Sequence, residues 1–471
     1  MEERMKENPL GTVPVNKLLR QFAIPSIIAM LVSALYNIVD QFFIGRSVGE
    51  LGNAATNIAF PLTTSCIAIA LLFGIGGASA FNLTLGKGDK EKALYYIGNA
   101  AVMMFGCGVV LLIIAQIFLT PLLKFFGSPA DVLGYAKTYT GITAIGFPFL
   151  ILATGGGHLV RADGSPKFTM ISNLVGAVIN TVLDALFVFG FHWGMAGAAV
   201  ATIIGQMISA GMVFYYLCHY KTGRIEKRHL RIRGKHVGRI ASLGAAPCSN
   251  QLAMMVVQVV LNKSLTYYGA LSDFGQSIPL ASAGIIMKVN QLFFSFIIGI
   301  SQGLQPIISF NYGAGKYARV KSAYLRAISY GGVLALTAFL MFQIFPRQII
   351  SLFGDGSGEY YRFATSFFRI FLFFTFLNFL QPITSNFFTA IGKPQKGIFL
   401  SLTRQIIFLL PLVIVLPLFM GMDGILYSGP IADFAAGVAA SIMVAKELKG
   451  KIYRKPRHLA ELETAEVRRS R

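Results

Sequence analysis

The sequence predicts an all-α membrane protein whose twelve transmembrane helices form two six-helix bundles, related by a pseudo-two-fold axis along the membrane normal. Three observations lead to this prediction: the composition, a series of long apolar runs, and an internal repeat. Of the 471 residues, 55% are hydrophobic and only 13% are charged, and the mean hydropathy is +0.63. Soluble domains are about 25% charged, so this chain is too apolar to be one of them.

Apolar runs long enough to cross a bilayer recur along the chain. A helix needs about 20 predominantly apolar residues to span the hydrocarbon core. The first run is too long for a cleavable signal peptide and is not followed by a small-residue cleavage pattern, so we expect it to be the first span. The predicted spans cover residues 22–44, 57–83, 94–119, 137–160, 168–191, 196–218, 240–262, 279–304, 325–345, 365–390, 397–420 and 424–445.

The second half of the chain repeats the first. Each half contains six predicted spans, so both halves enter the membrane from the same side and the repeats are parallel. Three glycine-containing motifs recur at a nearly constant spacing, which chance would not maintain. They are residues 86–88 and 313–315, 164–166 and 392–394, and 194–197 and 421–424.

Basic residues divide the chain into lobes and orient it. Most of the 41 lysines and arginines fall in alternate connections between spans, in the N-terminal segment and in the C-terminal tail, which positive-inside sorting explains better than nucleic-acid binding. We expect a multi-pass protein of the plasma membrane with both termini in the cytoplasm. The predicted parts are an N-terminal lobe (1–220), a basic cytoplasmic linker (221–239), a C-terminal lobe (240–446) and a basic cytoplasmic tail (447–471).

Asp40 is the only charged residue in the first span. A carboxylate in the middle of a membrane costs about 3 kcal/mol, so such residues usually face a cavity and handle ions. Tyr36 and Asn37 precede it by four and three residues, which puts all three on one helical face and makes them candidates for a substrate cavity. The alternative is that Asp40 lies near the outer interface and is simply hydrated.

Two further polar stripes occur in the fifth and sixth spans. Each has helical spacing and therefore faces one way. With Asp40 they offer two carboxylates and several neutral oxygens, suited to a sodium ion or a proton. For Gln206 and Ser209 the alternative is hydrogen bonding between helices. The stripes consist of Asn173, Asn180 and Asp184, and of Thr202, Gln206 and Ser209.

Other polar residues in the spans have structural interpretations. We expect Arg404 and Asp433 to form an ion pair or to hydrogen-bond separately, because neighbouring membrane helices often neutralise charges this way. Lys288 either snorkels outward or lines the cavity as a fixed positive charge. His158 is expected at the interface, since no histidine or cysteine lies near it at metal-ligand spacing. The four cysteines are interpreted as packing residues.

The sequence contains neither a nucleotide-binding loop nor a strong catalytic motif. Gly299-Ile300-Ser301-Gln302-Gly303 matches GxSxG, but a nucleophile elbow requires a strand-to-helix turn, and this pentapeptide lies in an apolar helix. We interpret its glycines, and those of 155–157, as close helix packing. The chain is therefore not expected to be an enzyme or to need a cofactor, and transport would have to be driven by an ion gradient.

Several motifs, taken in order, resemble those of the multidrug and toxin extrusion (MATE) family, and of its MepA-like branch in particular. The resemblance covers essentially all twelve spans. It rests on Pro25 and on residues 36–40, 74–88, 161–167, 180–184, 303–306 and 311–315.

This resemblance implies a secondary antiporter that exports bulky hydrophobic, often cationic compounds in exchange for H+ or Na+. It also implies a cation site in the N-terminal lobe at Asp40, Asn180, Asp184 and Thr202. Other branches of the family use carboxylates in the seventh and tenth spans, where this chain has none. Burial and mutual repulsion should make Asp40 and Asp184 titrate as one coupled pair.

Two other functions compete with this interpretation. A flippase of a related fold, acting on lipid-linked oligosaccharides, would need a more basic cavity, and only Lys288 and Arg404 are available for it. A channel would conduct ions without a substrate. We expect small-molecule substrates and the lipid bilayer as partners, no nucleic acid, and a monomer.

Overall fold

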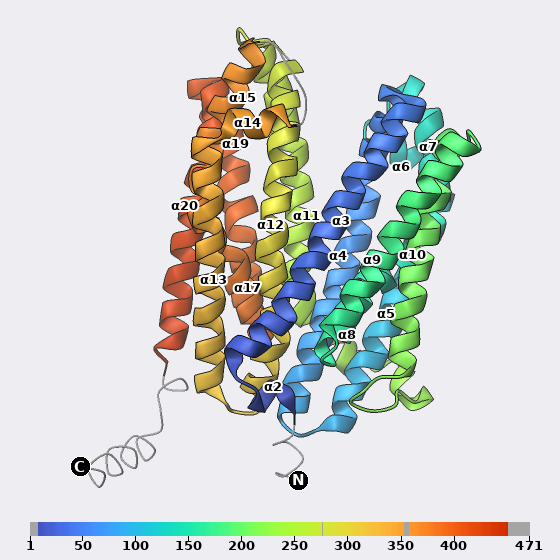
Figure 1. Cartoon of the computed structure of the whole chain (residues 1–471), viewed down its shortest axis with the longest axis vertical. Coiled ribbons are helices and arrows are strands. Elements are labelled where there is room, and N and C mark those ends of the chain that lie inside the picture. The colour runs from blue at the N-terminus through green and yellow to red at the C-terminus, as the bar shows by residue number, and fades with distance from the viewer. Residues whose placement is uncertain (1–7, 276, 353–357, 451–471) are drawn as a thin grey trace.

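The computed structural model of the chain describes residues 8–275, 277–352 and 358–450, and this part contains helices but no strand (Figure 1). Arg4, Lys6 and residues 451–471 of the predicted basic tail lie outside the described residues. The helices of the first half and the linker are α2 (Pro9–Thr12), α3 (Val15–Val48), α4 (Glu50–Gly86), α5 (Lys90–Ile117), α6 (Leu119–Phe125), α7 (Ala130–Ile145), α8 (Phe147–Ala162), α9 (Pro166–Asp184), η1 (Ala185–Gly190), α10 (Gly194–Cys218) and η2 (Lys227–Leu230).

The helices of the second half follow the same plan. They are α11 (Gly234–Ala270), α12 (Ser277–Gly313), α13 (Tyr317–Ile344), α14 (Pro346–Ser351), α15 (Gly358–Phe371), α16 (Thr375–Asn378), α17 (Leu380–Ala390), α18 (Pro394–Leu402), η3 (Thr403–Leu409), α19 (Leu410–Met420) and α20 (Met422–Leu448). Helix α11 begins at Gly234, so its first turns occupy the end of the segment predicted as linker.

Twelve spans are present, as predicted, but two of them are broken. Ten of the described helices are long and apolar enough to cross a membrane by themselves. The other two spans are bent pairs: α7 and α8 meet at 55°, and α15 and the segment Thr375–Ala390 meet at 44°. The sequence suggested continuous helices at both places. Gly146 caps α7, and Pro148 starts α8 at a position where a missing N–H costs nothing.

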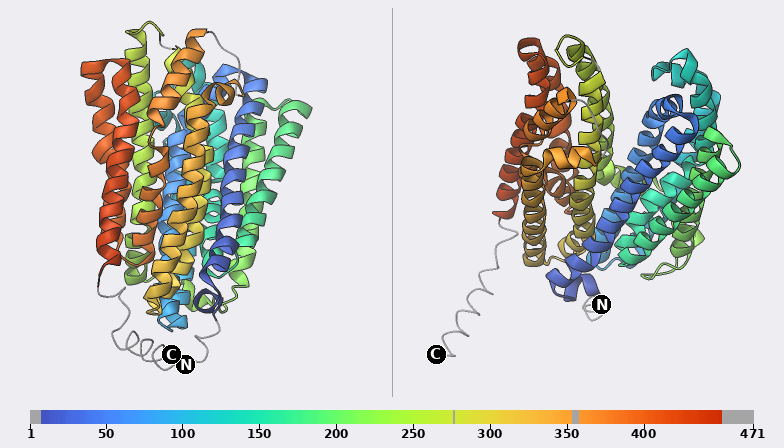
Figure 2. Two further views of the ribbon diagram at one scale, coloured as in Figure 1. Left: turned by 60° about the vertical axis from the view of Figure 1, so that its left-hand side comes forward. Right: turned by 45° about the horizontal axis from the view of Figure 1, so that its top comes forward.

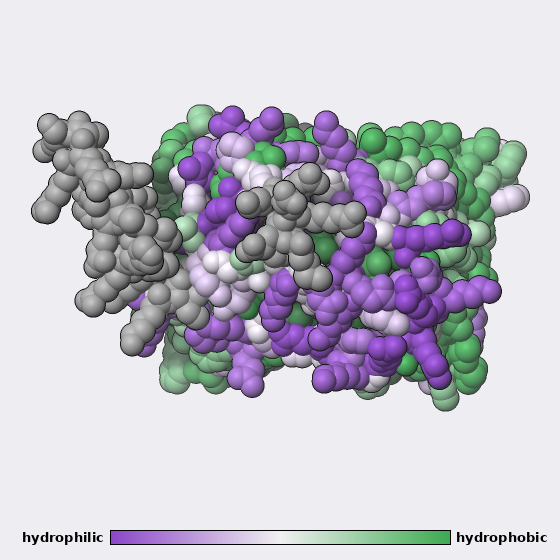
Figure 3. Space-filling model, turned by 90° about the horizontal axis from the view of Figure 1, so that it is seen from below, coloured by the Kyte–Doolittle hydropathy of each residue, from purple (hydrophilic) through white to green (hydrophobic). Residues whose placement is uncertain are grey.

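The two bundles touch at one end of the molecule and diverge at the other (Figures 1 and 2). We call the end that holds residues 8 and 450 the base, and the opposite end the apex. Seen from below, the base is rich in hydrophilic side chains (Figure 3). The N-terminal lobe (N-lobe) comprises most of α3 with α4–α10, and the C-terminal lobe (C-lobe) comprises most of α11 with α12–α20.

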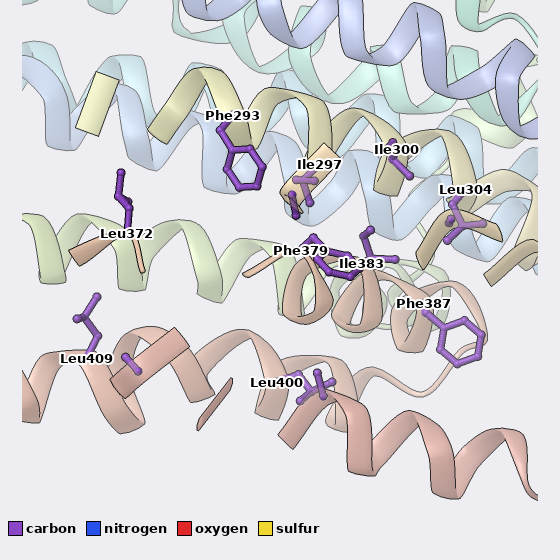
Figure 4. Close-up of a cluster of buried hydrophobic side chains, with 14 of the residues drawn as sticks. Phe293, Ile297, Ile300, Leu304, Leu372, Phe379, Ile383, Phe387, Leu400 and Leu409 are labelled. Atoms are coloured by element: carbon purple, nitrogen blue, oxygen red, sulfur yellow. The ribbon is translucent and has the colours of Figure 1, made fainter. Parts of the chain in front are cut away.

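The lobes exchange the first parts of their leading helices. Leu18 and Phe22 of α3 belong to the apolar core of the C-lobe, whereas Ile240 and Leu243 of α11 belong to the core of the N-lobe. The C-lobe core continues between α12 and α17, where Phe293 and Ile297 lie near Phe379 and Ile383 (Figure 4). Near the base, the first part of each leading helix therefore packs in the core of the other lobe.

Glycines allow the helices to approach closely where α11 packs against α4 and α12 packs against α3. A Cβ atom on Gly244 of α11 would lie 1.8 Å from the carbonyl oxygen of Leu72 in α4. On Gly303 of α12 it would lie 2.6 Å from the backbone nitrogen of Ala23 in α3. Small residues let membrane helices approach this closely. The interpretation of 299–303 as packing glycines is thereby confirmed.

The N-terminal segment reinforces contact at the base. Helix α2 leaves carbonyl groups that the C-lobe satisfies: the Asn311 side chain donates to the Leu10 carbonyl at 2.8 Å, Lys316 to that of Gly11 at 2.9 Å, and Arg319 to that of Val13 at 2.6 Å. Hydrogen bonds from charged donors are stronger than neutral ones. This segment therefore helps to hold the lobes together at the base.

Candidate functional site

The candidate ion site lies inside the N-lobe, where α3, α9 and α10 pack together. Asp40 comes from α3, Asn180 and Asp184 from α9, and Thr202 from α10. On α9, the buried polar positions Ser172, Asn180 and Asp184 are spaced by multiples of four, so one stripe faces the lobe interior. The structure thus brings together the four residues to which the family resemblance assigned the cation site.

The carboxyl groups of Asp40 and Asp184 lie close enough to interact with each other electrostatically. Asp184 is fully buried and Asp40 is only 8% exposed, so Asp40 is not simply hydrated at an interface. An ionised carboxylate can only accept a hydrogen bond, so the two groups can bond to each other only if one of them carries a proton. Without that proton, a cation between them would be needed to offset their repulsion.

The surrounding polar atoms are mainly acceptors. The side-chain amide of Asn180 donates to the Thr202 hydroxyl at 3.5 Å, which turns its oxygen the other way. That oxygen, both carboxyl oxygens of Asp184 and one of Asp40 are buried without a protein donor. A buried acceptor without a partner is costly. A proton or a sodium ion would satisfy these oxygens, because hard cations prefer oxygen ligands.

Two phenol rings complete the site. Tyr36, on α3, interacts electrostatically with both carboxylates. Tyr139, on α7, also interacts with Asp40 and Asp184, and the sequence analysis missed it. A hydroxyl near the start of the fourth apolar run was the only available signal. That signal could not show that Tyr139 would lie near carboxylates on α3 and α9, because this depends on the tertiary packing of the helices.

Other predicted residues lie apart from the carboxylates. Asn37 is exposed, and its side chain donates to the Ser33 carbonyl at 2.8 Å. Gln206 lies against Gly146, where α7 and α8 meet. Asn173 is half-buried. Lys288, also half-buried, belongs to α12 of the other lobe.

The serine stripe between α9 and α10 is structural. The Ser209 hydroxyl donates to the Ser172 carbonyl at 3.0 Å, and the Ser172 hydroxyl donates to the Ser209 carbonyl at 3.1 Å. The interpretation of Ser209 as an interhelical hydrogen-bonding residue is therefore confirmed. These reciprocal bonds fix the register of the two helices that carry Asn180, Asp184 and Thr202.

The C-lobe neutralises its buried carboxylate. Asp433 accepts a bond from Arg404 at 2.5 Å and one from Asn378 at 3.2 Å, which confirms the predicted ion pair. By contrast, the expectation that His158 lies at the interface is wrong. It is 2% exposed and contacts Arg161 at 2.9 Å, because α8 is packed on several sides. Within the described ranges, no three histidines, cysteines or acidic residues cluster as metal ligands.

Comparison with known proteins places this site in a family. The sequence pattern of the MatE family matches residues 25–186 and 251–415, which is most of the chain. The first of these ranges includes both Asp40 and Asp184. The chain belongs to the MatE family. As a member of this family of transporters it is not an enzyme, in agreement with the sequence prediction.

Relatives of the MepA-like branch match along nearly the whole chain. Multidrug export protein MepA of Staphylococcus aureus strain MRSA252 is 22% identical over 434 residues, covering 92% of this chain and 94% of that protein. The protein of the same name from Staphylococcus saprophyticus is 24% identical over 433 residues, covering 91% and 93%. The predicted resemblance to this family is confirmed.

Solved structures show the same fold. The MATE multidrug transporter DinF-BH is 30% identical with a TM-score of 0.86, covering 94% of this chain and 97% of that one. An outward-facing MATE family transporter is 22% identical with a TM-score of 0.86, covering 95% and 98%. A transporter from Pyrococcus furiosus is 21% identical with a TM-score of 0.87, with the same coverage. The predicted fold class is confirmed.

Proposed function

We propose that this protein exports bulky hydrophobic, often cationic compounds across the plasma membrane in exchange for H+ or Na+. The observation that carries the proposal is the pair Asp40 and Asp184, buried together and lined by acceptor oxygens that no protein group satisfies. Buried carboxylates in membrane helices typically mark ion pathways. The names of the relatives, multidrug export protein MepA, support the substrate class.

The arrangement of the lobes supports an alternating-access cycle. The lobes touch at the base and diverge at the apex (Figure 1), and the basic connections lie at the base. By the positive-inside rule we assign the base to the cytoplasm, so in this form the lobes diverge toward the outside. We propose that exposed Asn37 and half-buried Tyr36 and Lys288 line the space for substrate, together with Gln206, which lies beside Gly146 at the α7–α8 bend.

Neutralisation of the carboxylate pair would couple the two fluxes. An unneutralised pair attracts a cationic drug, whereas a proton or sodium ion held by Asp40, Asn180, Asp184 and Thr202 removes that attraction. Outside, arrival of the ion favours drug release. Inside, loss of the ion favours reloading. The flippase alternative is weakened, because Arg404 is already paired with Asp433 and does not contribute free positive charge.

Drug efflux from proteoliposomes, under separately imposed proton and sodium gradients, tests the proposal. We expect one of the two gradients to drive export, and we expect Asp184→Asn to abolish that export while the protein inserts and folds. Ion flux without drug would instead indicate a channel, and movement of a lipid-linked sugar would indicate a flippase. Either result would overturn the proposed antiport.

A further inference from the structure

A hollow of about 540 Å³, wide open to the surface, lies at the apical end of the N-lobe, apart from the base where the lobes meet, and we call it the apical chamber. Its walls come from the end of α3, the start of α7 and the turn between η1 and α10. The function described above does not use it. Its lining includes Asp131, Tyr135, Thr138, His192, Trp193 and Met195.

The helices that form this chamber also carry the ion site. On α3, Val48 of the lining lies eight residues beyond Asp40, which is about 12 Å along a helix. His192 likewise follows Asp184 by eight residues, through η1. On α7, the lining residue Thr138 directly precedes Tyr139. The chamber therefore lies about two helical turns above the carboxylates, toward the apex.

An apolar layer separates the chamber from the carboxylates. Ile44 follows Asp40 by four residues, and Val188 follows Asp184 by four, so each lies one turn higher on the same side of its helix. Both are at most 2% exposed, and they pack in one small cluster with Met195. Met195 also lines the chamber, and Tyr139 packs against the cluster from the side of the ion site. The layer is therefore about one helical turn, or about 5 Å, thick.

The charge of the chamber suits a cation. Asp131 is its acidic side chain, and neither lysine nor arginine occurs among the residues that line it. The aromatic side chains of Tyr135 and Trp193 also line it. His192 adopts a left-handed conformation with φ of 57°, which is uncommon for a residue other than glycine. Such conformations are often retained at functional sites.

We infer that the coupling cation reaches Asp40 and Asp184 from outside through this apical chamber and across the layer of Ile44, Val188 and Met195, and not through the space between the lobes. The inference rests on the proposed function for the use of a coupling ion. It gives the drug and the ion separate routes: the drug leaves between the lobes, and the ion enters through the N-lobe itself. A bound drug would then not block the ion that displaces it.

An accessibility experiment tests the route without requiring transport. Asp184→Cys is introduced after Cys66, Cys107, Cys218 and Cys248 are replaced by alanine, and the rate of its reaction with 2-aminoethyl methanethiosulfonate is measured in the purified protein. Adding Val188→Ala thins the apolar layer and should speed the reaction at least fivefold. Adding Val188→Phe should slow it.

The matched control obstructs the other route. Asn37→Trp adds a bulky ring at the exposed α3 position that we assigned to the space for substrate, and it should leave the reaction rate of the same cysteine unchanged. If Asn37→Trp slows the reaction and Val188→Ala does not change it, the ion comes from the space between the lobes and our inference is wrong. Val188→Ala only removes volume, so the test does not depend on whether the larger phenylalanine is tolerated.

A transport experiment separates this inference from the proposed function. Thr138→Cys in the same background, modified with the same reagent, places a positive charge in the chamber. It should raise the external cation concentration for half-maximal efflux at least tenfold and leave equilibrium drug binding unchanged. Thr337→Cys, exposed on α13, is the control. Unaltered cation dependence would contradict the route. If the unmodified protein shows no gradient-driven efflux, the proposed function fails, and the cysteine rates alone decide the route.

Discussion

In the N-lobe, Asp40 and Asp184 face each other among acceptor oxygens, whereas in the C-lobe Asp433 is held by Arg404 and Asn378. Both arrangements bury carboxylates in a six-helix bundle. The C-lobe supplies a permanent positive charge and two hydrogen bonds, so its carboxylate has little need of an ion from solution. The N-lobe supplies neither. Under the proposed function, the N-lobe binds the coupling ion and the C-lobe does not, although the two lobes share one fold.

The largest effect should come from removing either member of the N-lobe pair. Asp40→Asn and Asp184→Asn replace a carboxylate by an amide that cannot take up a proton and binds a cation more weakly. We expect each to lower gradient-driven efflux at least tenfold, with normal insertion and folding, measured in proteoliposomes. Full coupled transport by either variant would show that the N-lobe pair is not the coupling site.

Breaking the C-lobe pair should affect stability more than transport. Asp433→Asn leaves Arg404 buried without its counter-charge, and the loss of one partner of a buried pair costs about 3–5 kcal/mol. We expect a lower melting temperature but retention of much of the efflux per folded molecule. The double variant Arg404→Met/Asp433→Leu should recover most of the stability. A well-folded Asp433→Asn protein without transport would mean that both lobes handle ions.

Contact at the base can be weakened without touching either carboxylate site. Gly244→Ala forces a methyl group onto the Leu72 carbonyl and should separate α4 from α11, at a cost of about 1–3 kcal/mol. Thermal unfolding in detergent measures the loss. Gly211→Ala on α10 is the matched control, because no atom lies within 4 Å of its added methyl group. Equal stability of the two variants would contradict the close crossing at the base.

The smallest effect should come from the serine pair. Ser209→Ala removes one of two reciprocal bonds between α9 and α10, and such bonds in membranes contribute about 0.6 kcal/mol. We expect efflux close to that of the unaltered protein, whereas Thr202→Val, at the proposed ion site, should weaken coupling. Measuring efflux against external cation concentration for both variants distinguishes a structural polar residue from one that contacts the ion.

The sequence by itself determined the fold class, the number of spans, the repeat and the isolation of Asp40, because hydropathy, motif spacing and charge are local properties. It also offered an ion pair between Arg404 and Asp433 as one of two alternatives, since neighbouring membrane helices often neutralise charges in this way, and the structure shows that pair. The family resemblance supplied the association of Asp40 with Asp184, and periodicity alone could only place each on a helical face.

Only the tertiary structure decided which helices meet around those faces. Tyr139 joins the carboxylates because α7 packs against α4 and α10, the second of which also packs against α3 and α9, and no residue near Tyr139 in the sequence signals this. His158 is buried because α4, α5 and α10 pack around α8. The exchange of the first parts of α3 and α11 between lobes likewise depends on contacts between residues far apart in the sequence. Local pattern sets which side of a helix is polar, but packing against other helices sets what that side faces.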